Sequence, residues 1–302
     1  MPTDVAITAA KRPAQPPAPA EGTIPEFEIR PRRGWVPIDF KELFHYRELL
    51  YFLIWRDVKV RYKQTLLGFA WAILQPLVTM VIATAVFGGL AGFSGRMSEE
   101  LIARHVPYNL FVYAGLLPWM LFSVGISTGG TSLMNQQNLL TKVYFPRLFV
   151  PASVIGTALV DTAISFGVFF ILMAFAHVAP PWTVVFVPLL LLLTTLATMG
   201  IAFVLSSLTV TYRDFRFILP FMMQCWMFLS PVYYPLTVKK AWEQALVQAN
   251  PLYGLIEAFR SCLLGQHWKW KSLSISVLEI AVLLLVGLYY FKRTERRFAD
   301  IA

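Results

Sequence analysis

Residues 182–209 read WTVVFVPLLLLLTTLATMGIAFVLSSLT and contain no charged side chain. A helix needs about 20 mostly apolar residues to cross roughly 30 Å of hydrocarbon, so this stretch is long enough to span a membrane. Residues 178–182, VAPPW, leave room only for a tight hairpin between this span and the apolar run before it. The stretch therefore predicts an integral membrane protein.

The composition of the whole chain supports this interpretation. Of the 302 residues, 57% are apolar and 14% are charged, whereas about a quarter of an ordinary soluble domain is charged. A soluble enzyme and a disordered scaffold are thereby excluded. We expect an all-α transmembrane domain over residues 67–292, with six spans at about 68–92, 108–130, 149–177, 182–209, 217–236 and 273–291.

The placement of basic residues predicts the orientation. The chain has 26 Lys and Arg against 17 Asp and Glu, a formal charge of +9, which in a soluble protein would suggest a nucleic-acid partner. With both termini in the cytoplasm, 19 of the basic residues fall on the inner side and 7 on the outer side. This asymmetry follows the positive-inside rule. We therefore expect cytoplasmic termini, including residues 293–302, and no nucleic-acid partner.

The segment before the first span divides into two parts. Residues 1–37 hold eight of the 20 prolines, a composition typical of a disordered tail. Residues 38–66 predict an amphipathic helix lying in the membrane interface. Its aromatic and aliphatic face carries Tyr51, Ile54, Trp55, Val58 and Tyr62, and its other face is basic.

Four basic residues of this helix are candidates for binding a lipid head group: Arg56, Lys59, Arg61 and Lys63. Arginine binds phosphate oxygens in a bidentate manner, which suits the diphosphate of a polyprenyl-linked glycan. The alternative is a general attraction to anionic lipids. Asp57 next to Arg56, and four residues before Arg61, suggests a fixed geometry for these two arginines.

The third span carries an ionisable residue. Ser153, Thr157, Asp161 and Ser165 recur at every fourth position and so share one face of a helix. A carboxylate inside a span is costly and points inward by default. Asp161 is a candidate for lining a conduit, with structural bonding between helices as the alternative. A stripe of small residues in the fourth span, Thr194, Thr198, Ala202 and Ser206, predicts close helix packing.

Aromatic residues offer a second kind of contact. Aromatic faces suit the CH groups of sugars and would let a polymer slide without a deep binding well. The alternative is the aromatic belt that anchors membrane proteins at both interfaces. The candidates are Trp119, Trp226, Tyr233, Tyr234 and Trp242.

Two connecting segments have their own patterns. The inner connection STGGTSLMNQQNLLTKVYFPRLFVP, residues 127–151, predicts a short helix that Pro146 ends. It is either a docking element for a soluble partner or an ordinary turn. The outer connection, about residues 237–268, is half apolar, which predicts re-entrant helices that dip into the outer leaflet and are shielded by protein.

Several catalytic and binding motifs are missing from the sequence. GxxxxGK[ST], GxSxG and HExxH do not occur. Cys225 and Cys262 do not form a CxxC pair, so neither a zinc site nor a disulfide framework is expected. The chain is therefore expected to hold no cofactor or metal, and any ATP-driven process would need a partner that binds ATP and Mg²⁺.

Five motifs together resemble a known family. They are WRDVKVRYKQTLLGFAWAILQP from Trp55, YAGLLPW from Tyr113, NLLTKVYFPRLFVP from Asn138, TYRDFRFILP from Thr211 and NPLYGLIEAFR from Asn250. In this order they resemble the membrane subunit of type-2 ABC exporters. The nearest branch is the polysaccharide and O-antigen export permeases, which include capsule and teichoic-acid exporters. The similarity covers about residues 40–295, and the proline-rich extension departs from the family pattern.

The resemblance implies a homodimer with six spans per chain, paired with two ATP-binding subunits. It implies an interface helix at 40–66 and a coupling helix at about 131–145. It also implies that Gly68, Trp71 and Gln75 open the first span at a gate. The residues implied to contact the ATPase are Asn138, Leu139, Lys142, Tyr144, Phe145 and Arg147.

The expected function is therefore the permease half of an ATP-driven exporter that moves a lipid-linked polysaccharide across a bacterial inner membrane. An O-antigen is the first candidate for the cargo, and a capsule or teichoic acid is the alternative. A membrane-embedded glycan ligase or polymerase would need clustered acidic or histidine residues on an outer face. A proton- or sodium-driven transporter would normally carry several ionisable groups at midplane.

Overall fold

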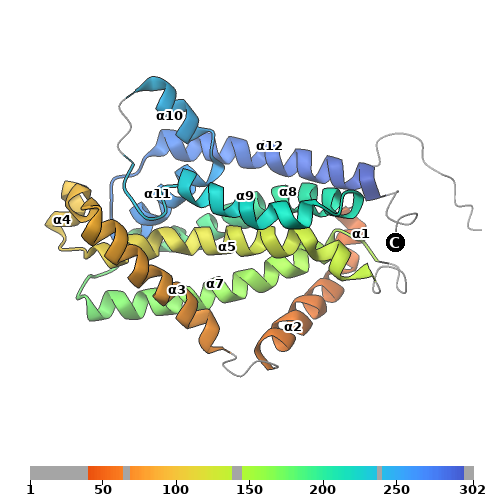
Figure 1. Ribbon diagram of the computed structural model, residues 1–302. Helices are drawn as coiled ribbons and strands as arrows, with labels where there is room; N and C mark the ends of the chain where they lie inside the picture. Colours follow the sequence, from red (N-terminus) through yellow and green to blue (C-terminus); the bar gives the residue numbers. More distant parts are fainter. Residues whose placement is uncertain (1–39, 64–68, 138–144, 237–239, 296–302) are drawn as a thin grey trace, which may run out of the picture. The chain divides into compact units, whose positions relative to one another are not determined.

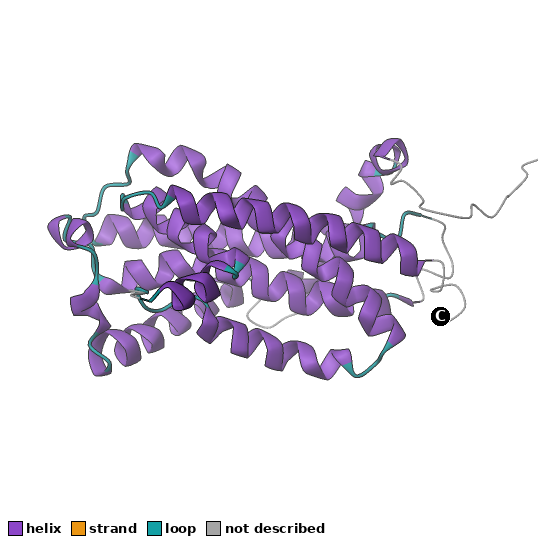
Figure 2. Ribbon diagram, turned by 90° about the horizontal axis from the view of Figure 1, so that it is seen from above, coloured by secondary structure: helices purple, strands orange, loops and turns teal. Residues whose placement is uncertain are grey.

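The computed structural model describes residues 40–63, 69–137, 145–236 and 240–295. These residues form helices joined by short loops, and they contain no strand (Figure 2). The predicted tail at 1–37 lies outside this part of the chain, as do Gly68 and most of the predicted coupling segment, residues 138–144. The prediction of an all-helical membrane protein is confirmed.

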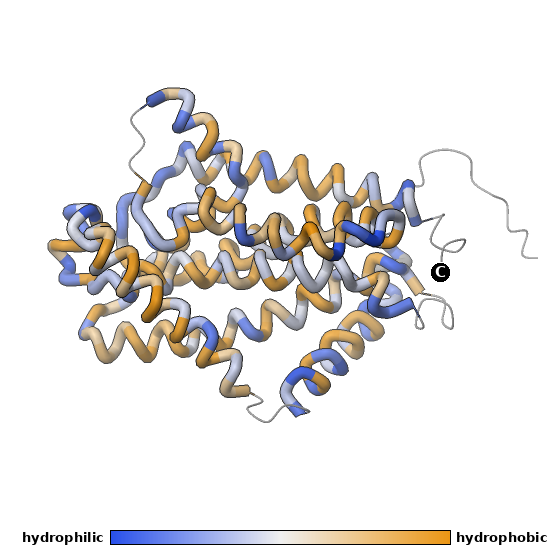
Figure 3. The backbone as a smooth tube through the Cα atoms, viewed as in Figure 1, coloured by the Kyte–Doolittle hydropathy of each residue, from blue (hydrophilic) through white to orange (hydrophobic). Residues whose placement is uncertain are grey.

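Five helices are long and apolar enough to cross a membrane, and Figure 3 shows hydrophobic residues along most of their length. Each overlaps one of the predicted spans. They are α3 (Ala70–Ala83) continued by the π-helix η1 (Thr84–Leu90), α5 (Tyr108–Asn135), α7 (Phe149–Phe175), η3 (Trp182–Phe186) continued by α8 (Val187–Thr211), and α12 (Trp270–Glu295).

The predicted span at 217–236 differs from the structure. The corresponding helix, α9 (Phe215–Leu229), has 15 residues and so is about 22 Å long, which is less than the roughly 30 Å of a hydrocarbon core. Pro231 has no N–H with which to continue the helix. The carbonyls of Pro231 and Val232 accept hydrogen bonds from Arg260 instead. The described chain thus has five long apolar helices and one short one.

Small residues bring the long helices together. α5 packs along α7 and α8 near the centre of the bundle (Figure 1). A Cβ added at Gly125 would meet the side chain of Thr198, and one at Gly129 would meet Ala202. The stripe of Thr194, Thr198, Ala202 and Ser206 is buried. The predicted close packing of this stripe is therefore confirmed.

Two helices precede the first long one. α1 (Phe40–His45) is followed directly by α2 (Arg47–Lys63), which packs against α7. Leu53 is the buried residue of α2, and Ile54 fills the space above Gly156. Of the predicted aromatic and aliphatic face, Ile54 and Tyr62 contact α7, whereas Tyr51 and Trp55 are exposed.

Short helices cap the opposite end of the bundle, which the predicted orientation makes the outer end (Figure 1). They are η2 (Phe93–Arg96), α4 (Glu99–Ala103), α10 (Ala241–Gln248) and α11 (Pro251–Leu264). Every residue of α11 is buried, because α5, α8 and α12 pack around it. The side chain of Asn250 caps its start, and Gly265 ends it with a φ of 76°.

Candidate functional site

The end of α2 meets an ionisable residue in the middle of α7. Arg61 Nη1 forms an ion pair with one carboxylate oxygen of Asp161, and Tyr62 Oη donates a hydrogen bond to the other. We call Arg61, Tyr62 and Asp161 the inner cluster.

The inner cluster lies near the middle of α7. Asp161 is twelve residues after Phe149, where this helix of 27 residues begins, and this places it about 18 Å along the helix. Arg61 and Tyr62 therefore reach a carboxylate within a candidate span, where a charge needs a partner or water.

The inner cluster lines a cavity of about 240 Å³ between α2, α3, α5 and α7. Trp71 and Gln75 of α3 line the same cavity, so two predicted gate residues lie beside the inner cluster. The side chains of Arg61 and Asp161 are 40% and 25% exposed. The cavity thus offers a phosphate or sugar an arginine, a carboxylate, an amide and an aromatic ring.

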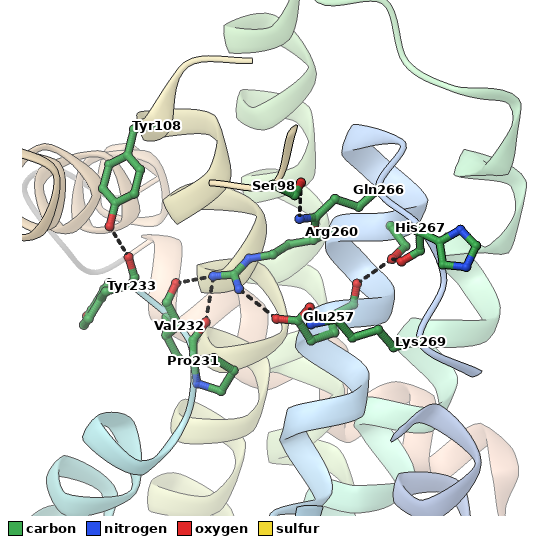
Figure 4. Close-up of polar contacts among 11 residues, drawn as sticks. Ser98, Tyr108, Pro231, Val232, Tyr233, Glu257, Arg260, Gln266, His267 and Lys269 are labelled. Atoms are coloured by element: carbon green, nitrogen blue, oxygen red, sulfur yellow. Dashed lines mark hydrogen bonds and ion pairs between the residues drawn. The ribbon is translucent and has the colours of Figure 1, made fainter. Parts of the chain in front are cut away.

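A second charged group lies at the outer end, where its arginine is fully enclosed and its lysine, Lys269, is 45% exposed (Figure 4). Arg260 on α11 has 0% exposure, and its Nη2 donates to the carbonyls of Pro231 and Val232 at 2.7 and 2.8 Å. Its Nη1 is 3.3 Å from Glu257 Oε1, and Lys269 Nζ is 2.8 Å from Glu257 Oε2. We call Glu257, Arg260 and Lys269 the outer network.

The outer network is stabilised from several sides. The guanidinium carbon of Arg260 lies 3.7 Å from the ring centre of Phe111, a favourable cation–π contact. Burial lowers the pKa of Lys269, but the carboxylate of Glu257 outweighs it and the pKa rises. Lys269 therefore stays charged at neutral pH. The Glu257 carboxylate thus has two basic partners, Lys269 and Arg260.

The outer network also positions aromatic residues. The Pro231–Val232 segment that Arg260 holds continues into Tyr233 and Tyr234, and Tyr108 Oη donates to the Tyr233 carbonyl (Figure 4). Tyr233 stacks on Phe87 with ring centres 5.2 Å apart. Tyr234 lies 5.6 Å from the ring centre of Phe93. These contacts join the end of α9 to η1 and η2.

Residues 48–264 match the family model described as ABC-2 type transporter. The chain belongs to the ABC-2 type transporter family. It is 30% identical over 265 residues to the O-antigen export system permease protein RfbA of Myxococcus xanthus, covering 86% of this chain and 97% of that protein. RfbA of Klebsiella pneumoniae is 24% identical and covers 84% and 95%. The polysialic acid transport protein KpsM of Escherichia coli is 25% identical and covers 80% and 92%.

The four predicted head-group residues of this ABC-2 type transporter do not converge. Arg56 contacts Asp57 Oδ1 at 2.7 Å and Gln136 Oε1 at 3.3 Å, which links α2 to the end of α5. Lys59 lies 5.2 Å from the ring centre of Trp55, and Lys63 is exposed. Of the four residues, Arg61 lines the cavity.

The predicted ATPase contacts lie mostly outside the described residues, namely Asn138, Leu139, Lys142 and Tyr144. Residues 131–135, expected in a separate coupling helix, are the last part of α5. Phe145 is 5% exposed and packs in a core cluster that includes Leu53. Arg147 Nη1 donates to the Glu295 carbonyl at 2.8 Å, which ties the start of α7 to the end of α12.

The predicted aromatic contacts of the transporter separate into three groups. Tyr233 and Tyr234 join the cluster with Phe87 and Phe93. Trp119 is 6% exposed, and Trp226 Nε1 donates to Asn250 Oδ1 at 3.0 Å. Trp242 on α10 is 64% exposed.

Sequence reasoning did not identify the outer network. Glu257 and Arg260 appear in the sequence analysis only within the motif NPLYGLIEAFR, with no role of their own. Their spacing of three within the helical EAFR segment was the available signal, since residues i and i+3 are neighbours on a helix. Within the described ranges, no group of three or more His, Cys, Asp or Glu side chains could hold a metal ion.

Proposed function

We propose that this chain is the permease subunit of an ATP-driven exporter that moves a lipid-linked polysaccharide, an O-antigen, across a bacterial inner membrane. The observation that carries the proposal is the 30% identity to an O-antigen export permease along 97% of that protein's length. The 25% identity to a polysialic acid transport protein makes a capsule polysaccharide the second candidate cargo.

The motor is a separate subunit in this proposal. The sequence has no P-loop to hold the phosphates of ATP. We propose a homodimer paired with two ATPase subunits that bind ATP and Mg²⁺. Each chain would contribute six spans, the sixth being α9 extended by the residues after Leu229, with both termini in the cytoplasm. The segment around 138–144 would contact the ATPase.

Arg61 would bind a phosphate of the lipid-linked substrate in the cavity. Its guanidinium is held by Asp161 in the structure, and a phosphate would offer it bidentate hydrogen bonds in place of this pair. Substrate binding would then exchange one anion for another and release the end of α2 from α7. Trp71 and Gln75, which line the same cavity, would contact the sugars next to the phosphate.

Transport into inverted vesicles tests the function. The chain co-purified with its ATPase should move lipid-linked glycan only when ATP is hydrolysed. Transport by the chain alone, or transport driven by a proton or sodium gradient, would refute the proposal. Glycan polymerisation or ligation without transport would instead indicate a membrane-embedded enzyme.

A variant pair tests the role of Arg61. Arg61→Gln should reduce glycan transport by about tenfold or more, because one charge-assisted phosphate contact is worth about 1.5–3 kcal/mol. Arg47→Gln is the matched control, since Arg47 starts the same helix and contacts Phe44 rather than the cavity. Equal transport by both variants would exclude a phosphate site at Arg61.

A further inference from the structure

A separate hollow opens at the outer end of the chain, away from the inner cavity. It has a volume of about 710 Å³ and is lined by α4, η3 and the connection between α11 and α12. Its lining includes Glu100, Arg104, Trp182, His267, Trp268 and Trp270. We call these six residues the outer hollow.

Three tryptophans of the outer hollow and Phe186 form a continuous series of ring contacts. Trp268 and Trp270 stack with ring centres 5.0 Å apart and an interplanar angle of 15°. Phe186 contacts Trp182 at 5.9 Å and Trp268 at 6.0 Å, in both cases edge to face. Trp182 and Trp270 remain 77% and 64% exposed, so broad ring faces are available beside the hollow.

The polar groups of the outer hollow are held by contacts between different elements. The His267 backbone N–H donates to Glu100 Oε2 at 2.7 Å. Gln266 Nε2 donates to Ser98 Oγ at 3.0 Å (Figure 4). Arg104 Nη2 donates to the Ala179 carbonyl at 3.2 Å. These bonds join α4 both to the α7–α8 hairpin and to the end of α11. The hollow is therefore organised before any ligand binds.

Gly265 shows how closely these parts fit. Its φ of 76° favours glycine, and a Cβ there would collide with the guanidinium of Arg104. Arg104 thus lies directly over the turn that ends α11. The side chain of Arg104 is therefore held by the Ala179 carbonyl on one connection and lies against the Gly265 turn on another.

The chemistry of the outer hollow favours a neutral sugar. Exposed aromatic faces cover the apolar CH face of a pyranose ring. The Glu100 carboxylate and the Arg104 guanidinium, each held by a hydrogen bond, suit hydroxyls at its edge. One acidic and one basic side chain balance each other, which disfavours a strongly charged polymer. An ordinary interfacial belt also uses tryptophan, but it needs no organised polar groups between the rings.

We propose that the outer hollow binds a short stretch of neutral pyranose units. We assign these units to the exported polymer after it has left the conduit, and this assignment rests on the proposed function. Binding there would hold the emerging chain on the outer side and oppose its return. The hollow would be a second glycan site, distinct from the inner cavity at Arg61.

The test measures binding directly. The permease–ATPase complex in lipid nanodiscs is titrated with the glycan of the source cell, released from its lipid by mild acid, and binding is followed by saturation-transfer NMR. Trp270→Ala and Trp182→Ala should each weaken binding about tenfold, since each removes an exposed ring face. Trp55→Ala is the matched control, because Trp55 is also exposed, at 48%, but lies on α2 and does not line the hollow.

The outcomes separate the two proposals. Unchanged binding by Trp270→Ala and Trp182→Ala, or an equal loss with Trp55→Ala, would refute the site while leaving ATP-driven export untouched. Glycan binding that depends on Trp270, in a complex without ATP-driven transport, would support the site and refute the export function. Binding by the wild-type complex that is lost in the two hollow variants alone is the expected result.

Discussion

The inner cluster and the outer network differ in how their arginines are enclosed. In the outer network, Arg260 is 0% exposed and is surrounded by two carbonyls, a carboxylate and an aromatic ring. In the inner cluster, Arg61 and Asp161 are 40% and 25% exposed and border a cavity. A buried charge with many partners is a fixed part of the fold. A half-exposed pair beside a cavity can exchange its partner for a ligand.

The largest expected effect is the loss of Arg260. Arg260→Met would leave Glu257 with one basic partner and the carbonyls of Pro231 and Val232 without their donor. Breaking a buried pair in this way costs about 3–5 kcal/mol of unfolding free energy. Unfolding by SDS in mixed micelles measures it. Lys240→Met is the control, because Lys240 is 69% exposed and its contact with Glu243 is 4.0 Å long.

Glycine-to-alanine changes compare the rigidity of the contact between α11 and α12 with that between α2 and α7, and their expected effect is smaller. A Cβ at Gly254 in α11 would collide with the Ser272 carbonyl of α12, which is backbone, whereas a Cβ at Gly156 would meet the side chain of Ile54. Gly254→Ala should therefore cost about 1–3 kcal/mol, and Gly156→Ala should cost less because Ile54 can rotate.

Gly167→Ala provides the baseline for this comparison, since a Cβ there meets no described atom within 4 Å. It should be neutral, or stabilising by up to about 1 kcal/mol, because alanine favours a helix over glycine. The same SDS unfolding experiment reports all three variants. A greater loss for Gly156→Ala than for Gly254→Ala would show that the contact between α2 and α7 is the more rigid of the two.

The long helices could be predicted from the sequence because hydropathy reports them directly. The run predicted at 149–177 is α7, Phe149–Phe175, and the uncharged run at 182–209 is η3 with α8. The small residues at Thr198 and Ala202 likewise indicated close packing that the structure contains. These features depend on residues within one helix, so a single sequence is enough to find them.

Features that depend on how separate segments meet could not be predicted. Asp161 was recognised as an intramembrane charge, but its partner Arg61 is 100 residues earlier, on a helix whose path the sequence does not specify. The end of α9 at Leu229 depends partly on Arg260, whose guanidinium binds the carbonyls that follow. Both cases are set by tertiary contacts rather than by local periodicity.

Neutralising the inner pair should have a small effect on stability. Arg61→Gln alone would leave Asp161 with Tyr62 as its donor, at a cost of about 1–3 kcal/mol, because the carboxylate loses its charged partner but still borders a cavity. The double variant Arg61→Gln and Asp161→Asn should recover this loss, because neither side chain is then charged. Recovery of stability without recovery of glycan transport would separate a structural pair from a phosphate site.

The smallest expected effect concerns Tyr62. Tyr62→Phe removes one hydrogen bond to Asp161 and should cost about 0.5 kcal/mol of unfolding free energy, at the low end for a bond beside an open cavity. Arg61 would then be the remaining partner of the carboxylate from α2. The exchange of Asp161 for a phosphate, and with it glycan transport, should change only slightly. SDS unfolding and vesicle transport, measured beside Tyr51→Phe as the exposed control on the same helix, test this. A loss of several kcal/mol would mean that the inner cluster is as rigid as the outer network, and its role as an exchangeable pair would have to be abandoned.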